Sequence, residues 1–300
     1  MTIDAADRFG FHPVGALTAR VVDGARAVFV LTAFAVLTLP LMPVQAILKR
    51  TSTSAARRFP NWYHRQVCRL LGVRLNITGA IAQDQPVLVV ANHTSWLDIV
   101  VLSAVAPVSF VAKREVAGWP FVGSLARLQR TVFVDRTRRM QVGATASEIA
   151  ERLQTNDAIV LFAEGTSSDG NRVLPFRSSL FAAVAGLRPD RGSSDGGGPQ
   201  ASAAPISVQT LSLVYTRLHG IPLMRGDRPL VGWYGDMEMG AHAWQLLTAG
   251  PVDAAIDIGP PIALDTFNNR KDIAQSTEAD VRAAVISRLR KASDDAMPHS

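Results

Sequence analysis

Cysteine is nearly absent from this chain, since Cys68 is the only one in 300 residues. A single thiol excludes an internal disulfide framework and is typical of a reducing compartment. The sequence also lacks zinc-finger spacing and the aromatic and basic pattern of ribonucleoprotein motifs, which argues against nucleic acid as a partner. Acidic residues are fewer than basic ones, 25 against 31, and this excess of positive charge indicates an anionic partner such as a membrane surface.

Residues 27–48 form the longest stretch without a formal charge. As a helix this stretch would be about 33 Å long, which is enough to cross a bilayer. Pro40 and Pro43 leave open a kinked or re-entrant segment within one leaflet, and a buried core helix is a further alternative. More lysine and arginine follow the stretch than precede it. This bias predicts a protein of the inner membrane whose C-terminal part faces the cytoplasm.

After residue 58 the pattern changes to short apolar runs that alternate with helical stretches. Strands are expected at 86–91, 108–112, 131–135, 158–162 and 208–215, and helices at 95–104, 115–128 and 142–153. This alternation predicts an α/β fold with a mixed, largely parallel sheet layered by helices, preceded by an N-terminal membrane-associated helix. We expect a membrane-anchoring segment at 1–58, a catalytic domain at 59–290 with a flexible loop at 189–205, and a tail at 291–300.

The segment Asn92–Asp98, NHTSWLD, follows an expected strand and precedes an apolar helix, where α/β sheets place ligands. With His93 in the turn and Asp98 in the first helical turn, the carboxylate can reach the imidazole. A carboxylate on one ring nitrogen leaves the other nitrogen to accept a proton near neutral pH. A substrate hydroxyl could then take the place of the serine in a hydrolase triad. Helix capping is the alternative role of Asp98.

Two other strand ends carry polar residues. The segment FAEGTSS at 162–168 holds Glu164 and Gly165, and its turn either binds an anion or is a plain turn without a ligand. The strand 131–135 delivers Arg136, whose planar guanidinium suits an anionic headgroup. Lys113 follows another strand. Both cations are equally compatible with a solvated surface.

Together NHTSWLD, VFVDR at 132–136 and FAEGTSS resemble, in order and spacing, the motifs of the glycerolipid acyltransferases, over roughly residues 75–223. The resemblance implies that His93 is the general base and Asp98 its orienting partner. It also implies that Arg136, Glu164 and Gly165 bind the acceptor headgroup, and Thr166 and Lys113 are further candidates for substrate binding. The expected donor is acyl carrier protein or acyl-CoA, the acceptor is a lysolipid in the membrane, and no metal or cofactor is implied.

Several positions depart from the usual motifs. Ala163 stands where proline is usual, Ser167 where an arginine is usual, and Arg130 where glycine is usual, and 208–212 lacks the prolines of a fourth motif. These departures resemble the lyso-ornithine lipid acyltransferase branch, whose acceptor has a zwitterionic headgroup, with Arg177 or Arg217 as a replacement cation. Lysophosphatidic acid acylation is the alternative, and a non-catalytic lipid-binding protein is a third hypothesis.

Overall fold

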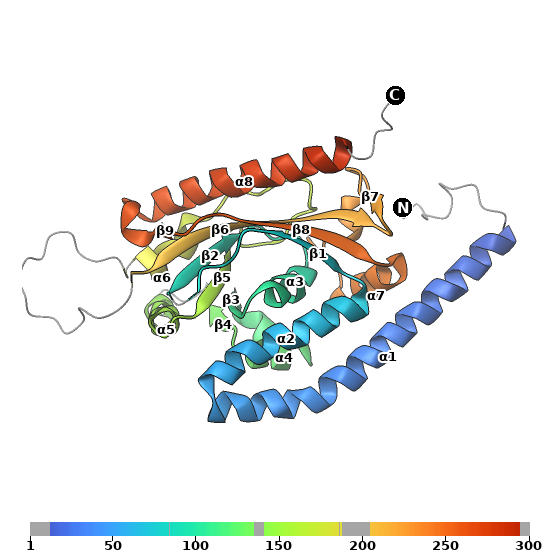
Figure 1. Ribbon diagram of the computed structural model, residues 1–300, viewed down its shortest axis with the longest axis horizontal. Coiled ribbons are helices and arrows are strands. Elements are labelled where there is room, and N and C mark those ends of the chain that lie inside the picture. Colours follow the sequence, from blue (N-terminus) through green and yellow to red (C-terminus); the bar gives the residue numbers. More distant parts are fainter. Residues whose placement is uncertain (1–12, 84, 135–140, 186, 188–204, 295–300) are drawn as a thin grey trace, which may run out of the picture.

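The computed structural model describes residues 13–294 except residues 84, 135–140, 186 and 188–204 (Figure 1). The candidate residue Arg136 therefore lies outside the described residues. The same is true of nearly all of the expected loop 189–205 and of residues 295–300 of the expected tail.

A nine-stranded sheet forms the centre of the fold, in the order β1-β8-β6-β2-β5-β3-β4, with the short strands β7 and β9 paired to β6. All neighbours along this order run parallel except β6 and β8. The predicted mixed, largely parallel sheet is confirmed. The strands are β1 Arg74–Thr78, β2 Val87–Ala91, β3 Val108–Lys113, β4 Val132–Val134, β5 Ala158–Phe162, β6 Ser207–Leu218, β7 Ile221–Pro222, β8 Val252–Ile258 and β9 Ile262–Ala263.

Helices cover both faces of the sheet, as Figure 1 shows, with α8 on one face and α2 and α3 on the other. Every residue of β2 is buried, because Val87 and Val89 face the core under α3 while Leu88 and Val90 face the core under α8. The helices are α1 Pro13–Thr51, α2 Thr53–Leu71, α3 Leu97–Val105, α4 Val122–Leu128, α5 Gln141–Gln154, α6 Ala182–Ala185, α7 Met239–Ala249 and α8 Arg270–Asp294, with 3-10 turns at η2 Arg114–Gly118, η3 Ser178–Phe181, η4 Arg228–Leu230 and η5 Leu264–Thr266.

The expected single helix at 115–128 is wrong, because the structure has η2 and then α4 in its place. Pro120 follows Trp119, whose backbone is extended, as is usual for a residue before proline. Phe121 then adopts φ 61°, which no helical residue can have. The chain therefore turns between the two short helices.

The helix α1 contains the uncharged stretch 27–48 and runs unbroken through Pro40 and Pro43. Its segment Val21–Thr51 is the one helix of the described residues long and apolar enough to cross a membrane, and 17% of its most apolar window is buried. A core helix is therefore excluded. The next helix, α2, passes through residue 58 without a break and packs on α3, so the division between anchor and catalytic domain stays a prediction.

One side of α1 is fastened to the catalytic part by polar side chains along its length. Arg26 donates to the carbonyl of Leu247, Gln45 Nε2 donates to the Leu128 carbonyl at 2.9 Å, and Lys49 Nζ donates to the Arg127 carbonyl at 2.6 Å. From Arg26 to Lys49 the helix is about 35 Å long. The opposite side exposes large apolar side chains, which include Val28, Phe29, Val36, Leu39 and Ile47.

Candidate active site

The turn between β2 and α3 is fixed to the sheet by the side chain of Asn92. Its Nδ2 donates to the Leu213 carbonyl and its Oδ1 accepts from the Leu213 amide, both at 2.9 Å. The Asn92 amide thus acts as one more backbone rung between β2 and β6, directly before His93. Because both strands are buried, this rung gives the turn a rigid base.

His93 and Asp98 are in contact, as the sequence predicted. Nδ1 of His93 lies 2.8 Å from Oδ2 of Asp98, whose side chain is fully buried. The same oxygen accepts from the amides of Thr94 at 2.7 Å and Ser95 at 3.0 Å. Because Oδ2 of Asp98 already accepts from two amides, it also acts as the acceptor toward His93, so Nδ1 of His93 carries the proton. In this tautomer Nε2 keeps its lone pair.

Tyr215 completes the surroundings of Asp98, and sequence reasoning missed it. Its hydroxyl donates to Oδ1 of Asp98 at 2.7 Å. Burial, together with the negative charge of Asp98, raises the pKa of Tyr215 well above its ordinary value. The phenol therefore keeps its proton at neutral pH and remains a hydrogen-bond donor. Tyr215 lies within an expected strand and outside the three catalytic motifs, so no local pattern indicated its contact with Asp98.

The imidazole of His93 stacks on the ring of Phe162, with the centroids 4.0 Å apart and the planes 16° from parallel. Phe162 stacks in turn on Phe110 at 6.1 Å. One face of the imidazole is therefore covered by an apolar wall, and Nδ1 is held by Asp98. The His93 side chain remains 19% exposed, so part of the imidazole is accessible from solvent.

Glu164 faces inward. Its Oε1 accepts from the His93 amide at 2.8 Å and its Oε2 from the Leu174 amide at 2.9 Å, and the residue is 1% exposed. Burial raises the pKa of this carboxyl to about 8, and the charge of Asp98 acts in the same direction. Glu164 thus ties the His93 turn to the loop after β5, which is the contact expected of a residue that organises the loops.

The structure also describes three other predicted site residues, Gly165, Thr166 and Lys113. Gly165 has φ 75°, which glycine adopts without strain, and Thr166 is exposed beside it. Lys113 is exposed at the end of β3, and within the described residues no hydrogen bond or ion pair joins it to His93. The described residues include no group of three or more His, Cys, Asp or Glu side chains that could hold a metal.

Two of the unusual motif positions have clear surroundings. Arg130 has φ 64°, a conformation that favours glycine, and its guanidinium is paired with the buried Asp157 at 2.5 Å. Ser167 donates its hydroxyl to the Trp233 carbonyl. The position where an arginine is usual therefore carries a side chain that is already engaged within the protein.

Known proteins similar to this chain match it over most of its length. The protein-family profile described as Acyltransferase matches residues 73–225, which include His93, Asp98, Glu164 and Tyr215. The chain is 45% identical to a lyso-ornithine lipid O-acyltransferase from Brucella abortus, over 88% of this chain and 95% of that protein. It is 39% identical to a second one from Rhizobium meliloti, over 84% and 83%.

Other relatives are more distant. A 1-acyl-sn-glycerol-3-phosphate acyltransferase from Neisseria meningitidis is 40% identical, over 39% of this chain and 46% of that protein. The crystal structure of the 1-acyl-sn-glycerophosphate acyltransferase from Thermotoga maritima superimposes with a TM-score of 0.60, over 89% of this chain and 95% of that one, at 19% identity. At that identity the likeness shows a shared fold.

Proposed function

Because the chain belongs to the acyltransferase family, as the order of its motifs predicted, we propose that it transfers a fatty acyl group to the hydroxyl of lyso-ornithine lipid. The relatives from Brucella abortus and Rhizobium meliloti, which match over most of their length, are both named for that activity. The observation that carries the chemistry is the 2.8 Å contact of His93 with the fully buried Asp98. It supports His93 as general base and Asp98 as the residue that orients it.

In the reaction, Nε2 of His93 takes the proton of the lysolipid hydroxyl as the oxygen attacks the thioester carbonyl of the donor. Asp98 stabilises the imidazolium that forms. The tetrahedral intermediate then releases the thiolate, which receives the proton from His93, and the new ester remains on the lipid. The Gly165 amide donates to the Phe162 carbonyl at 3.1 Å, so the backbone amide of Thr166 is our candidate for binding the oxyanion.

The preferred donor is acyl carrier protein, with acyl-CoA as the alternative. Carrier proteins of this kind are acidic, and a chain with net charge +6 attracts an acidic partner electrostatically. Lys113 and Arg136 remain candidates for substrate contacts, and their test is the salt dependence of the rate with each donor.

The apolar helix and the membrane-lipid relatives indicate membrane association, and we propose that α1 lies within one leaflet on the cytoplasmic side of the inner membrane. The polar contacts from Arg26 to Lys49 extend over about 35 Å, more than the hydrocarbon thickness of roughly 30 Å. A crossing helix would draw those contacts and the attached α2, α4 and α7 into lipid. Polar backbone and charged groups in that position would be strongly unfavourable.

The test is acyl transfer by purified protein in lipid vesicles, with labelled acyl carrier protein and either lyso-ornithine lipid or lysophosphatidic acid. We expect labelled ornithine lipid with the wild type and none above background with His93→Ala. As a matched control, His219→Ala removes an exposed histidine and should leave the rate unchanged.

Each outcome separates the hypotheses. Phosphatidic acid as the better product would keep the mechanism and replace the acceptor by the one named for the Neisseria relative. Full activity of His93→Ala would contradict the general base. No transfer to either lipid, with tight lipid binding retained, would identify a lipid-binding protein.

A further inference from the structure

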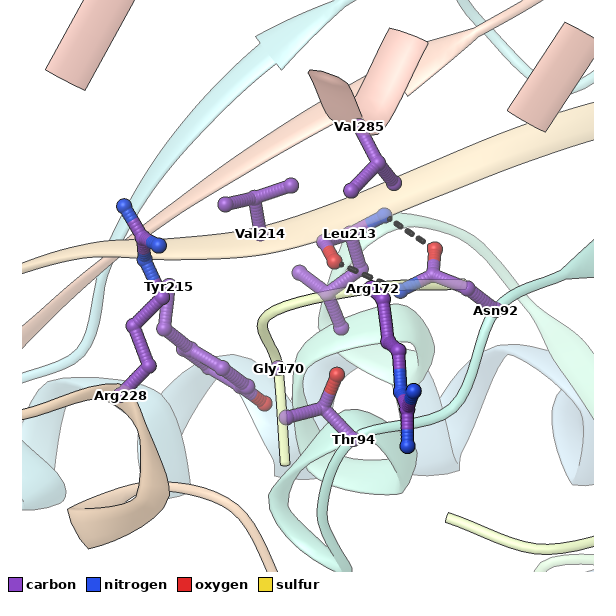
Figure 2. A pocket seen from close by; sticks show the side chains of 9 residues that line it. All are labelled: Asn92, Thr94, Gly170, Arg172, Leu213, Val214, Tyr215, Arg228 and Val285. Atoms are coloured by element: carbon purple, nitrogen blue, oxygen red, sulfur yellow. Dashed lines mark hydrogen bonds between the residues drawn. The ribbon is translucent and has the colours of Figure 1, made fainter. Parts of the chain in front are cut away.

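A small cavity lies beside the His93 turn, on the side of α8 (Figure 2). Its volume is about 10 Å³, which accommodates one water-sized atom. The wall includes Asn92, Thr94, Gly170, Arg172, Tyr215 and Arg228. Figure 2 shows the two arginines on either side of the loop that carries Gly170. A cavity with cationic walls next to a catalytic turn suggests a site for a single anionic oxygen.

Arg228 is unusual because its charge is buried with few partners. The residue is 8% exposed, Nη1 donates to Oδ1 of Asn171 at 3.0 Å, and the buried Nε has no hydrogen-bond partner among the residues that the structure describes. Buried guanidinium groups are normally paired and fully hydrogen-bonded, because desolvation of a lone charge is costly. Burial and the nearby cation Arg225 lower the pKa of Arg228, while the carboxylates of Asp169 and Asp227 raise it. An incoming anion would accept a hydrogen bond from the buried Nε.

The segment that carries Arg228 is joined to the catalytic turn. The Trp233 amide donates to the Thr94 carbonyl at 2.9 Å, and the Ser168 amide donates to the His93 carbonyl at 2.9 Å. At Gly170, a Cβ atom would lie 3.2 Å from Cγ2 of Thr94 and 3.7 Å from Cβ of Arg228. The cavity wall and the His93 turn are therefore one packed unit.

We propose that Arg228 binds one oxygen of the ornithine carboxylate of the acceptor lipid, while the Arg172 guanidinium points away from it on the other side of the Gly170 loop (Figure 2). This inference rests on the proposed function, because it assigns the headgroup contact of the same reaction. Binding of the carboxylate supplies the missing partner of the buried guanidinium. It also fixes the headgroup while the lipid hydroxyl reaches His93.

The size of the site favours a carboxylate over a phosphate. A planar carboxylate can insert one oxygen and leave the other at the rim, whereas a tetrahedral phosphate presents three oxygens to its site. Ser167, at the position where an arginine is usual, is already bonded to the Trp233 carbonyl. The candidates from the sequence, Arg177 and Arg217, do not line this cavity.

The experiment compares two acceptors, lyso-ornithine lipid and the same lipid with its carboxylate converted to a primary amide. The wild type should have a kcat/KM for the amide lower by about tenfold or more, since a charge-assisted contact is lost. Arg228→Gln should raise KM for the carboxylate lipid by about the same factor and leave KM for the amide within about threefold. Arg290→Gln, an exposed change on α8, is the matched control and should behave as wild type.

If Arg228 has only a structural role, Arg228→Gln should lower kcat/KM equally for both acceptors and should also lower the melting temperature. That result, or a wild type that uses both acceptors equally well, overturns the subsite. If Arg228→Gln fails to fold, Arg228→Lys retains the cation without the planar fork and should show reduced discrimination between the two acceptors. A wild type inactive on both lipids would instead overturn the proposed function, so the two failures are distinguishable.

Discussion

Replacing Tyr215 by phenylalanine tests how Asp98 is held. The change removes the hydroxyl that donates to Oδ1 of Asp98 at 2.7 Å and keeps the ring in the core. Asp98 retains three donors on Oδ2, but Oδ1 is then buried without any donor from the described residues. A hydrogen bond to a charged group contributes about 1.5–3 kcal/mol, and the loss should lower the free energy of unfolding by that amount.

The effect on catalysis follows from the same contact. If about 1.4 kcal/mol of the lost interaction also supports the transition state, kcat falls about tenfold. The loss should appear in kcat, because the Tyr215 hydroxyl contacts Asp98 and not the reacting atoms. Thermal unfolding of purified protein and acyl-transfer rates at saturating substrate measure the two quantities.

Tyr63→Phe is the matched control for this experiment. The Tyr63 hydroxyl is bonded to the neutral Thr38 at 2.7 Å, away from the catalytic turn. Its removal should cost about 0.5–1.5 kcal/mol of stability and leave kcat unchanged. If Tyr215→Phe resembles this control in both stability and kcat, Tyr215 does not position the catalytic carboxylate.

Three further results are expected. Asp98→Asn keeps an acceptor for the turn amides but cannot stabilise an imidazolium, so kcat should fall by about 10³ to 10⁴ with little change in melting temperature; a loss below about tenfold would contradict the dyad. Burial raises the pKa of Glu164 from its ordinary value of 4.5 to about 8, so between these two pH values the native state holds a proton that the unfolded chain has released. The stability of the wild-type protein should therefore decline as pH rises from about 4.5 to 8. In melting curves recorded at several pH values, Glu164→Gln should show a smaller decline. An unchanged pH dependence in this variant would contradict the role of Glu164. In a variant with Cys68 replaced by alanine, single cysteines introduced at Gly24 and Arg50 test the position of α1. Both cysteines should react with an impermeant maleimide in inside-out vesicles, and neither should react in intact spheroplasts. Labelling of the two cysteines from opposite sides would show that α1 crosses the membrane.

Local patterns in the sequence predicted much of this molecule. The strands at 86–91 and 158–162 are runs of β-branched and aliphatic residues, and the structure has β2 and β5 there. The contact between His93 and Asp98 could be predicted because it is made within one turn. The family resemblance then supplied the acyl-transfer chemistry, which the comparisons confirm.

Contacts between distant segments could not be predicted in this way. Tyr215 is 117 residues from Asp98, and only the pairing of β6 with β2 brings it beneath the turn. The inward direction of Glu164 depends on the Leu174 amide and on burial, which no spacing reveals. In the same way, an uncharged stretch predicts a membrane helix but not that Gln45 and Lys49 fasten it to α4.

Opening of the catalytic turn can be measured by hydrogen exchange, because the Asn92 side chain joins the turn to the sheet. The Leu213 amide is bonded to Oδ1 of Asn92, so its proton exchanges with deuterated solvent only when the turn leaves the sheet or the whole fold opens. The exchange rate of this amide, compared with those of β6 residues bonded only to backbone, therefore reports how often the catalytic turn opens by itself. A rate equal to that of the strand would mean that the turn and the sheet open as a single unit.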